Sequence, residues 1–313
     1  MSVILGFDTS NYTTSVAIYN SNTNEMISCG KLLDVKSGER GLRQSDALFL
    51  HTKQLPDVIK QAFSQYEGKK IDAVCVSTQP RSIDNSYMPV FLSGLSAATS
   101  AACALDVPLY TTSHQNGHAL AALYSLNRLD LINQPFLAFH VSGGTTEALY
   151  VTPSDKNIIN CELVGKTLDL NAGQVIDRIG VKLGLKFPCG NELDKLAQDG
   201  KLTQKPHPTL KGTDCCLSGL ENICDKMLDT EEKADVARFL FEYISQTLLK
   251  MTQKLHDKYG NIPTVYAGGV MRNSIIRSNL KGLFASPEFS SDNAAGVAVI
   301  GSLTLEKSGD NGK

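Results

Sequence analysis

The stretch VILGFDTSNYTTSVAIYN, residues 3–20, decides the fold. Residues 3–7 form a short apolar run, residues 9–15 are polar, and residues 16–19 are again strand-like. An apolar run, a polar turn and a second run with strand character predict two strands joined by a polar hairpin loop.

The same pattern returns in FLAFHVSGGTTEALYVT, residues 136–152, with a turn rich in hydroxyls and glycine at 142–146. A duplicated lobe that opens with a polar hairpin is typical of the actin-like ATPases (the ASKHA fold), which hold a nucleotide between two RNase H-like lobes. Neighbouring backbone N–H groups in such a turn can bind phosphate oxygens. Taken alone, Gly143 and Gly144 also fit a simple tight turn. The repetition predicts a two-lobed α/β protein of this class.

The two hairpins set the expected domain boundaries. We expect residues 1–112 to form the first lobe and residues 113–293 to form the second lobe with a helical insertion. A terminal helix at 294–313 would pack on the first lobe.

The composition is that of an ordinary globular protein, with 313 residues, 42% hydrophobic and 20% charged. No apolar run is long enough to span a membrane, and the first residues lack the pattern of a signal peptide. The eight cysteines form no CxxC pair, which predicts reduced thiols in a cytoplasmic protein. A net charge of −2 means that any nucleic-acid contact needs a local patch. The candidates, which also fit a solvated face, are Lys182, Lys186, Lys201, Lys205 and Lys211.

Helix and strand patterns alternate between the hairpins. Residues 48–66 predict an amphipathic helix, 71–77 a buried strand and 91–105 a helix of small residues. Residues 107–111 then predict the strand that leads to the next motif.

That motif is TSHQNGH, which places His114 and His118 four residues apart. This spacing puts both rings on one helical face, as a metal site would, and it also occurs without any metal. In zinc peptidases of the HExxH type a glutamate follows the first histidine, but here Gln115 does, which disfavours peptidase chemistry. A third ligand, preferably a carboxylate, would have to come from elsewhere.

Three segments of the second half carry polar side chains at breaks. Residues 168–197 predict a helix with a break at 187–190. Asp177 and Asp194 flank this break and are either surface charges or acceptors for ribose hydroxyls. Residues 262–280 predict a strand, a glycine turn and a helix, where a ligand can approach the backbone. Residues 289–303 place Asp292 before a helix, as a ligand or as an N-cap.

Together these motifs resemble the tRNA N6-adenosine threonylcarbamoyltransferase family (TsaD-like, once described as O-sialoglycoprotein endopeptidases), over nearly the whole chain. His114 and His118 match the family's HxxGH motif, and Asp292 in SSDNA matches its TDN motif. The turn SGG matches the phosphate hairpin, AGQVID matches the segment that carries a ribose-binding aspartate, and LSGL at 217–220 is similar to FSGLK. The resemblance implies a metal site at His114, His118 and Asp292, and a nucleotide site at Ser142, Gly143, Gly144, Asp177, Gly190, Asp194 and Asn273.

Family members transfer a threonylcarbamoyl group from threonylcarbamoyl adenylate to N6 of the adenosine beside the tRNA anticodon. The resemblance therefore implies one divalent metal, iron or zinc, with ATP or threonylcarbamoyl adenylate as the nucleotide ligand. It also implies tRNA binding with the help of partner proteins or accessory subunits, and no membrane.

The chain departs from the family mainly where the family faces its substrate. Tyr12 and Thr13 stand where the family has Asp and Glu, Asn116 replaces a glutamate, and Thr145 replaces a histidine. Residues 77–94 replace a glycine-rich segment. The catalytic residue is therefore not identified, and Asp8 and Thr13 are the candidates in the first hairpin. The alternative is a divergent paralogue that acts as a carbamoyltransferase on a non-tRNA acceptor, or as a non-catalytic nucleotide-binding subunit. A sugar-kinase-like relative is a further alternative, but it leaves the histidine pair unexplained.

Overall fold

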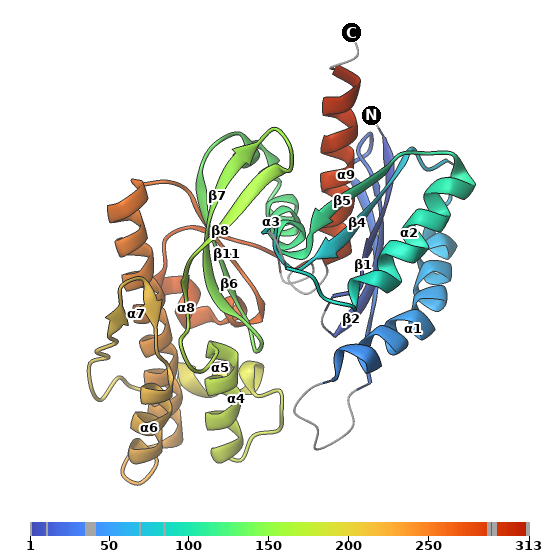
Figure 1. The fold of residues 1–313 in the computed structure, drawn as a ribbon. Coiled ribbons are helices and arrows are strands. Elements are labelled where there is room, and N and C mark those ends of the chain that lie inside the picture. The colour runs from blue at the N-terminus through green and yellow to red at the C-terminus, as the bar shows by residue number, and fades with distance from the viewer. Residues whose placement is uncertain are drawn as a thin grey trace. The chain divides into compact units, whose positions relative to one another are not determined.

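The structure, a computed structural model, describes residues 2–10, 12–34, 42–68, 70–83, 86–286, 289 and 293–310. Its contacts divide the chain into two compact units (Figure 1). Unit 1 consists of Met1–Asn133, Thr152–Cys161 and Glu288–Lys313, and unit 2 of Gln134–Val151 and Glu162–Pro287.

The sheet of unit 1 has five strands in the order β3-β2-β1-β4-β5. The first hairpin pairs β1 with β2 in antiparallel fashion, and β3 extends it, while β4 and β5 run parallel to β1. The hairpin predicted from residues 3–20 is confirmed. The strands are β1 (Val3–Asp8), β2 (Thr13–Asn20), β3 (Glu25–Leu32), β4 (Ala73–Gln79) and β5 (Leu109–Ser113).

The side chains of β1 alternate between the two faces of this sheet, and different helices pack on each face. Val3, Leu5 and Phe7 belong to the apolar core that also contains residues of α1 (Gln44–Gln65) and α2 (Phe91–Leu105). Because side chains alternate along a strand, Gly6 and Asp8 face the other side. There Gly6 meets α9 (Asn293–Asp310), which in turn packs on α3 (His114–Ser125).

Small residues let α9 approach its neighbours closely. A Cβ on Gly6 would lie 2.6 Å from the carbonyl oxygen of Ala294, and a Cβ on Gly296 would overlap the carbonyl oxygen of Gly117 in α3. Helix α9 is therefore held against both β1 and α3 by backbone contact. This packing also fixes the position of α3 relative to the end of β1.

Unit 2 repeats the arrangement with the strand order β12-β11-β6-β7-β8. The second predicted hairpin is confirmed as the antiparallel pair β6–β7, and β11 and β12 run parallel to β6. Two sheets, each opened by a polar hairpin, confirm the predicted α/β class with a duplicated lobe. The strands are β6 (Phe136–Val141), β7 (Thr146–Ser154), β8 (Ile158–Lys166), β11 (Thr264–Ala267) and β12 (Leu283–Phe284).

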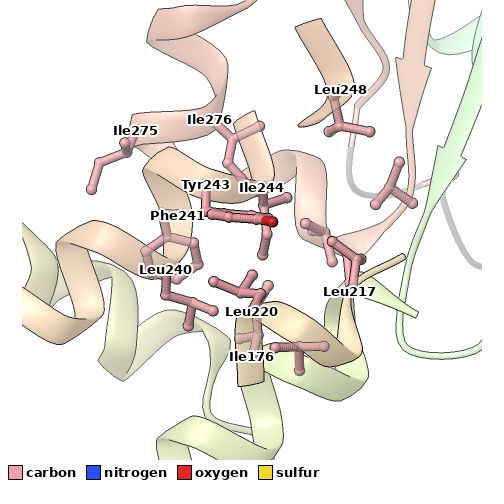
Figure 2. Close-up of a cluster of buried hydrophobic side chains, with 14 of the residues drawn as sticks. Ile176, Leu217, Leu220, Leu240, Phe241, Tyr243, Ile244, Leu248, Ile275 and Ile276 are labelled. Carbon is pink, nitrogen blue, oxygen red and sulfur yellow. The ribbon is translucent and has the colours of Figure 1, made fainter. Parts of the chain in front are cut away.

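Helices supply most of the core of unit 2. The 27-residue helix α7 (Lys233–Tyr259) packs against α5, α6 and α8, and its Thr252 side chain hydrogen-bonds the Tyr266 hydroxyl of β11 at 2.8 Å. Figure 2 shows Leu240, Phe241 and Ile244 of α7 among the buried side chains of neighbouring elements. The other elements of this unit are α4 (Ala172–Lys182), α5 (Gly190–Gln198), β9 (Leu210–Lys211), β10 (Asp214–Cys215), α6 (Ser218–Met227), η2 (Gly269–Arg272) and α8 (Ser274–Asn279), while η1 (Leu129–Asn133) belongs to unit 1.

The predicted elements agree with the structure in different degrees. The helix expected at 91–105 is α2 to the residue, and the helix expected at 168–197 is the pair α4 and α5 with a break between them. The lobe boundary expected at 112/113 stays a prediction, whereas the contacts place α3 in unit 1 because it packs on α9. Among the helices described, none combines the length and hydropathy needed to cross a bilayer. All eight cysteines lie in the described part of the chain, and none of them forms a disulfide there.

The contact of Gly296 with Gly117 generates a stability prediction. Gly296→Ala should lower the free energy of unfolding by about 1–3 kcal/mol, because the added methyl group overpacks the α3–α9 contact. Gly309→Ala, in the same helix and with nothing near its Cβ, is the matched control and should be neutral or slightly stabilising. Urea unfolding followed by circular dichroism measures both. Equal stability of the two variants would contradict the proposed close packing.

Candidate nucleotide and metal sites

The first candidate site lies in unit 1, where β1 ends and α3 begins. Strand β5 ends at Ser113 and α3 starts at His114, so the chain carries this histidine directly to the carboxyl edge of the sheet. The Ser113 hydroxyl caps α3 by accepting from the amide of Asn116 at 3.2 Å. His114 Nδ1 lies 3.0 Å from Asp8 Oδ2 and 2.7 Å from Ser10 Oγ. The structure thus joins two predicted site residues, Asp8 and His114, which are 106 positions apart.

Asp8 is an unusual carboxylate because it is almost fully buried, at 1% exposure. Burial alone would raise its pKa, but the charge and hydrogen bond of the His114 ring, together with hydrogen bonds from Ser10, hold the pKa below its ordinary value. The amide of Ser10 donates to Asp8 Oδ1 at 2.8 Å. Both carboxylate oxygens therefore have a partner.

The two histidines of α3 lie together, as their spacing predicts. The ring centroids of His114 and His118 are 4.5 Å apart. Asp292, the expected third ligand, lies outside the described residues. Within the part of the chain that the structure describes, no three His, Cys, Asp or Glu side chains are arranged to hold a metal ion. The three-ligand set stays a prediction.

The donor chemistry of this edge nevertheless fits a transition metal. Two imidazoles suit iron or zinc, and a carboxylate on the outer nitrogen of a ligating histidine is the usual supporting contact. One buried polar atom at this edge, Ser77 Oγ, has no hydrogen-bond partner among the described residues. Ser77 follows Val76, the strand partner of Phe7, so it lies beside Asp8 in the sheet. Buried polar atoms normally have a partner, so the Ser77 hydroxyl indicates a polar ligand or water nearby.

The rest of the first hairpin carries no acid. Thr13 begins β2 with its amide donating to the carbonyl of Ser10 at 3.3 Å, and Tyr12 is 45% exposed. Its neighbour Thr14 bonds the buried core residue His51 at 2.8 Å. In this hairpin Asp8 is therefore the candidate whose carboxylate already contacts another site residue.

The second candidate site is a cavity of about 260 Å³ within unit 2. Its wall comes from the second hairpin, from α4, α5 and α7, and from the turn after β11. A cavity of this size, lined by both polar and apolar residues, suits a small ligand. It is lined by Gly143, Gly173, Ile176, Asp177, Pro188, Gly190, Asn191, Asp194, Phe241, Gly269, Val270, Arg272 and Asn273.

The hairpin turn brings an open backbone surface to this cavity. A Cβ on Gly143 or Gly144 would meet no protein atom within 4 Å, and neither glycine has a φ in the left-handed region. The space beside both glycines is therefore open to a ligand. The backbone conformation itself does not require glycine at either position. The Ser142 hydroxyl accepts from the amides of Gly144 and Thr145 at 3.3 and 3.1 Å, which fixes the turn.

Asp177 of α4 has one carboxylate oxygen that can accept a further hydrogen bond. Its Oδ1 accepts from the amide of Cys189 at 2.8 Å, which ties α4 to the break before α5. Its Oδ2 accepts no hydrogen bond from the described residues. An aspartate held by one oxygen and open at the other can accept a ribose hydroxyl.

Asp194 and Asn273 are used differently from Asp177. Asp194 Oδ1 accepts from Asn273 Nδ2 at 2.8 Å and from Ser274 Oγ at 2.9 Å, and Oδ2 accepts from the Ser274 amide at 3.2 Å. Asn273 Oδ1 in turn caps α8 by accepting from the amide of Ile276. Asp194 therefore anchors α5 to α8 and orients Asn273, whose second N–H remains to donate. Gly190, at the start of α5, lines the cavity with open space at its Cβ position.

Several lining residues are not among the predicted site residues, and Arg272 and Phe241 are two of them. Arg272 is exposed, forms no ion pair among the described residues, and directly precedes the predicted site residue Asn273. Its position next to Asn273 is a sequence signal that can identify it as a cavity residue. Phe241 comes from α7, and no motif marks it.

The lysines considered for nucleic-acid contact include one with acidic partners. Lys182 pairs with Asp225 at 2.7 Å and with Glu221 at 3.2 Å. Glu221 also pairs with Arg178 at 2.9 Å. Exposed pairs of this kind add little stability, but they remove an unpaired positive charge from the surface. At Lys182 the solvated-face interpretation fits better than a phosphate contact.

The family model described as tRNA N6-adenosine threonylcarbamoyltransferase (TsaD) matches residues 38–299. The chain belongs to this family. The match spans both units, including the two histidines of α3 and all the predicted nucleotide-site residues. The family places the chain among the transferases.

Similar solved structures show the fold. HypF of T. kodakarensis has a TM-score of 0.60 at 14% identity, over 97% of this chain and 48% of that one, so this chain spans about half the length of HypF. Component A of the (R)-2-hydroxyglutaryl-CoA dehydratase of Acidaminococcus fermentans has a TM-score of 0.56 at 14% identity, over 98% and 100% of the two chains. The activator of the 2-hydroxyisocaproyl-CoA dehydratase of Clostridium difficile, solved with bound ADPNP, has 0.53 at 12%, over 99% and 97%. The predicted actin-like ATPase fold is confirmed.

The open oxygen of Asp177 generates a binding prediction. Asp177→Ala should weaken the binding of an adenosine nucleotide by about 1–3 kcal/mol, because a ribose hydroxyl of the nucleotide would lose the carboxylate that accepts its hydrogen bond. Glu192→Ala, which removes an exposed carboxylate from the first turn of α5, is the control and should leave affinity unchanged. Isothermal titration calorimetry with ATP measures both variants. If Asp177→Ala binds as tightly as the unaltered protein, Asp177 does not belong to the nucleotide site.

Proposed function

We propose that this protein transfers a threonylcarbamoyl group from threonylcarbamoyl adenylate to N6 of the adenosine beside the tRNA anticodon. The observation that carries the proposal is the family match over residues 38–299. It is supported by the unit 2 cavity, which is lined by Gly143 of the open hairpin and by Asp177 with its open carboxylate oxygen. These are the two contacts that an adenylate needs, for its phosphate and for its ribose.

In this proposal unit 2 binds the nucleoside part of the adenylate. Asp177 accepts a ribose hydroxyl through Oδ2, and Asn273 donates its second N–H to the nucleoside. Gly143 and Gly144 let the phosphate approach the backbone of the hairpin. The dehydratase activator was solved with bound ADPNP, an ATP analogue, which supports nucleotide binding by this fold.

Unit 1 would hold the metal through His114, His118 and Asp292. A metal held there would supply Lewis-acid polarisation of the mixed anhydride. In the transfer, the N6 nitrogen forms a bond to the carbamoyl carbon, the bond from that carbon to the phosphate oxygen breaks, and AMP leaves. N6 loses one proton, and the first hairpin offers no acid or base at Tyr12 or Thr13 to take part in its removal.

The altered first hairpin is the specific observation that favours a second function. A chain that kept nucleotide binding but changed its acceptor would be a carbamoyltransferase for a small molecule or protein, or a nucleotide-binding subunit without turnover. The ion-paired lysine at 182 fits both this alternative and a tRNA enzyme that relies on partner proteins for RNA contacts. Strong, salt-dependent tRNA binding separates the two.

The transfer assay tests the proposed function directly. Purified protein, threonylcarbamoyl adenylate, unmodified tRNA and candidate partner proteins should yield modified adenosine above the level without protein. Nucleoside mass spectrometry detects the product, and an ordinary family member serves as the positive control. Absence of product while the control is active and nucleotide still binds would favour the second function.

The metal assignment gives a separate prediction. His118→Ala and Asp292→Ala should each lose bound iron or zinc while the circular dichroism spectrum stays that of the unaltered protein, because each removes one of three ligands. His207→Ala, an exposed histidine in unit 2, is the control and should retain the metal. Metal analysis by plasma mass spectrometry measures all three. Full metal content in the two ligand variants would refute the assignment.

A further inference from the structure

Parallel pairing brings Asp8 to His114. Strand β4 lies between β1 and β5, so the carboxyl ends of the three strands share one edge of the sheet. Asp8 is the last residue of β1, and His114 directly follows the last residue of β5. Asp8 also faces the side of the sheet on which α9 and α3 pack, opposite the core that holds Phe7.

The hydrogen bonds at Asp8 have a fixed direction. The backbone N–H of Ser10 must donate, so Asp8 Oδ1 accepts from it at 2.8 Å. The remaining oxygen, Oδ2, is 3.0 Å from His114 Nδ1 and as a carboxylate oxygen can only accept. Nδ1 therefore carries the hydrogen, and in a neutral imidazole the other nitrogen, Nε2, is then bare.

We propose that Asp8 is the positioning residue of His114: it selects the tautomer with hydrogen on Nδ1 and so leaves Nε2 as the nitrogen that can bind a metal. The link to a metal rests on the proposed function, whereas the choice of tautomer does not. In this role Asp8 touches neither substrate nor metal. It acts through the ring of His114.

The geometry makes Asp8→Asn a sharp test. The amide N–H of Ser10 still needs an acceptor, so the asparagine oxygen takes the place of Oδ1. Its NH₂ group then takes the place of Oδ2 and donates to His114 Nδ1. The hydrogen of the ring must move to Nε2, which blocks that nitrogen as a ligand. The substitution keeps the shape of the side chain and inverts the tautomer.

Ser10→Ala is the matched control. Ser10 Oγ is also within 2.7 Å of Nδ1, but its hydroxyl can accept or donate and so does not dictate the tautomer. Its removal should leave the hydrogen on Nδ1. A second control, Asp72→Asn, removes a partly exposed carboxylate of unit 1 that accepts from the amide of Val3 at 2.9 Å. This variant controls for the effect of losing one negative charge.

The experiment is long-range proton–nitrogen NMR on metal-free protein labelled with ¹⁵N-histidine, at about pH 8, well above the ordinary range for histidine in model peptides. His114→Gln identifies the signals of the ring. The unaltered protein, Ser10→Ala and Asp72→Asn should show a bare Nε2, and Asp8→Asn a protonated Nε2. A protonated Nε2 in the unaltered protein, or an unchanged tautomer in Asp8→Asn, would overturn the proposal. The first of these needs no variant to fold.

A zinc titration against a chromogenic chelator separates this proposal from the metal assignment. Asp8→Asn should bind zinc about 10–100-fold more weakly than the unaltered protein, the usual loss when the partner of a ligating histidine is changed. Asp72→Asn should stay within about threefold, and Ser10→Ala, which removes a second partner of the His114 ring, should lose less affinity than Asp8→Asn. If Asp8→Asn inverts the tautomer but binds zinc as well as the unaltered protein does, His114 Nε2 is not a ligand. If no protein binds zinc while the NMR result holds, the metal assignment fails and the positioning by Asp8 stands.

Discussion

The parallel pairing of β1, β4 and β5 is the constraint on which unit 1 depends. It brings the end of β1 and the start of α3 to one edge, and the hydrogen bond between Asp8 and His114 joins them there. A slip of β1 by one residue would turn Asp8 toward the apolar core of α1 and α2 and leave a buried charge unpaired. The register of the strand and the hydrogen bond at its end therefore support each other. Close packing of α9 on Gly6 and on α3 completes the same arrangement.

Unit 2 uses the same topology for a different purpose. Strands β6 and β11 also run parallel, and at their carboxyl ends Gly268 lies against the carbonyl of Val141 with a φ of +100°, so that only glycine fits well. The turn that follows β6 has no acid, and its glycines leave the backbone open to a cavity. Duplicated hairpins have thus become two kinds of site. One carries a buried carboxylate that holds a histidine, and the other carries a bare backbone that a phosphate can approach.

The sequence predicts those parts whose signal is local. Both hairpins follow from period-two patterns and polar turns, and α2 follows from its run of small apolar residues. Helix α7 is not predicted, because its residues between 236 and 248 are buried on nearly all sides and show little periodicity. For the same reason Phe241 is not identified as a cavity residue. The partner of Asp8 also could not be predicted, since nothing near position 8 indicates a histidine 106 residues away.

The distribution of the departures from the family now has a structural meaning. Tyr12, Thr13, Asn116 and residues 77–94 all belong to unit 1, and only Thr145 belongs to unit 2. The residues expected to bind the nucleotide all belong to unit 2, and those among them that line the cavity do so beside residues that no motif marks. A chain that had lost nucleotide binding should have changed in unit 2, at Asp177 or in the open hairpin. A chain that altered its transfer step or its acceptor should have changed in unit 1, around the histidines, and there the changes lie. Asp8 and His114 are hydrogen-bonded to each other in the middle of that altered region, which makes this pair the first place to look for a changed transfer step.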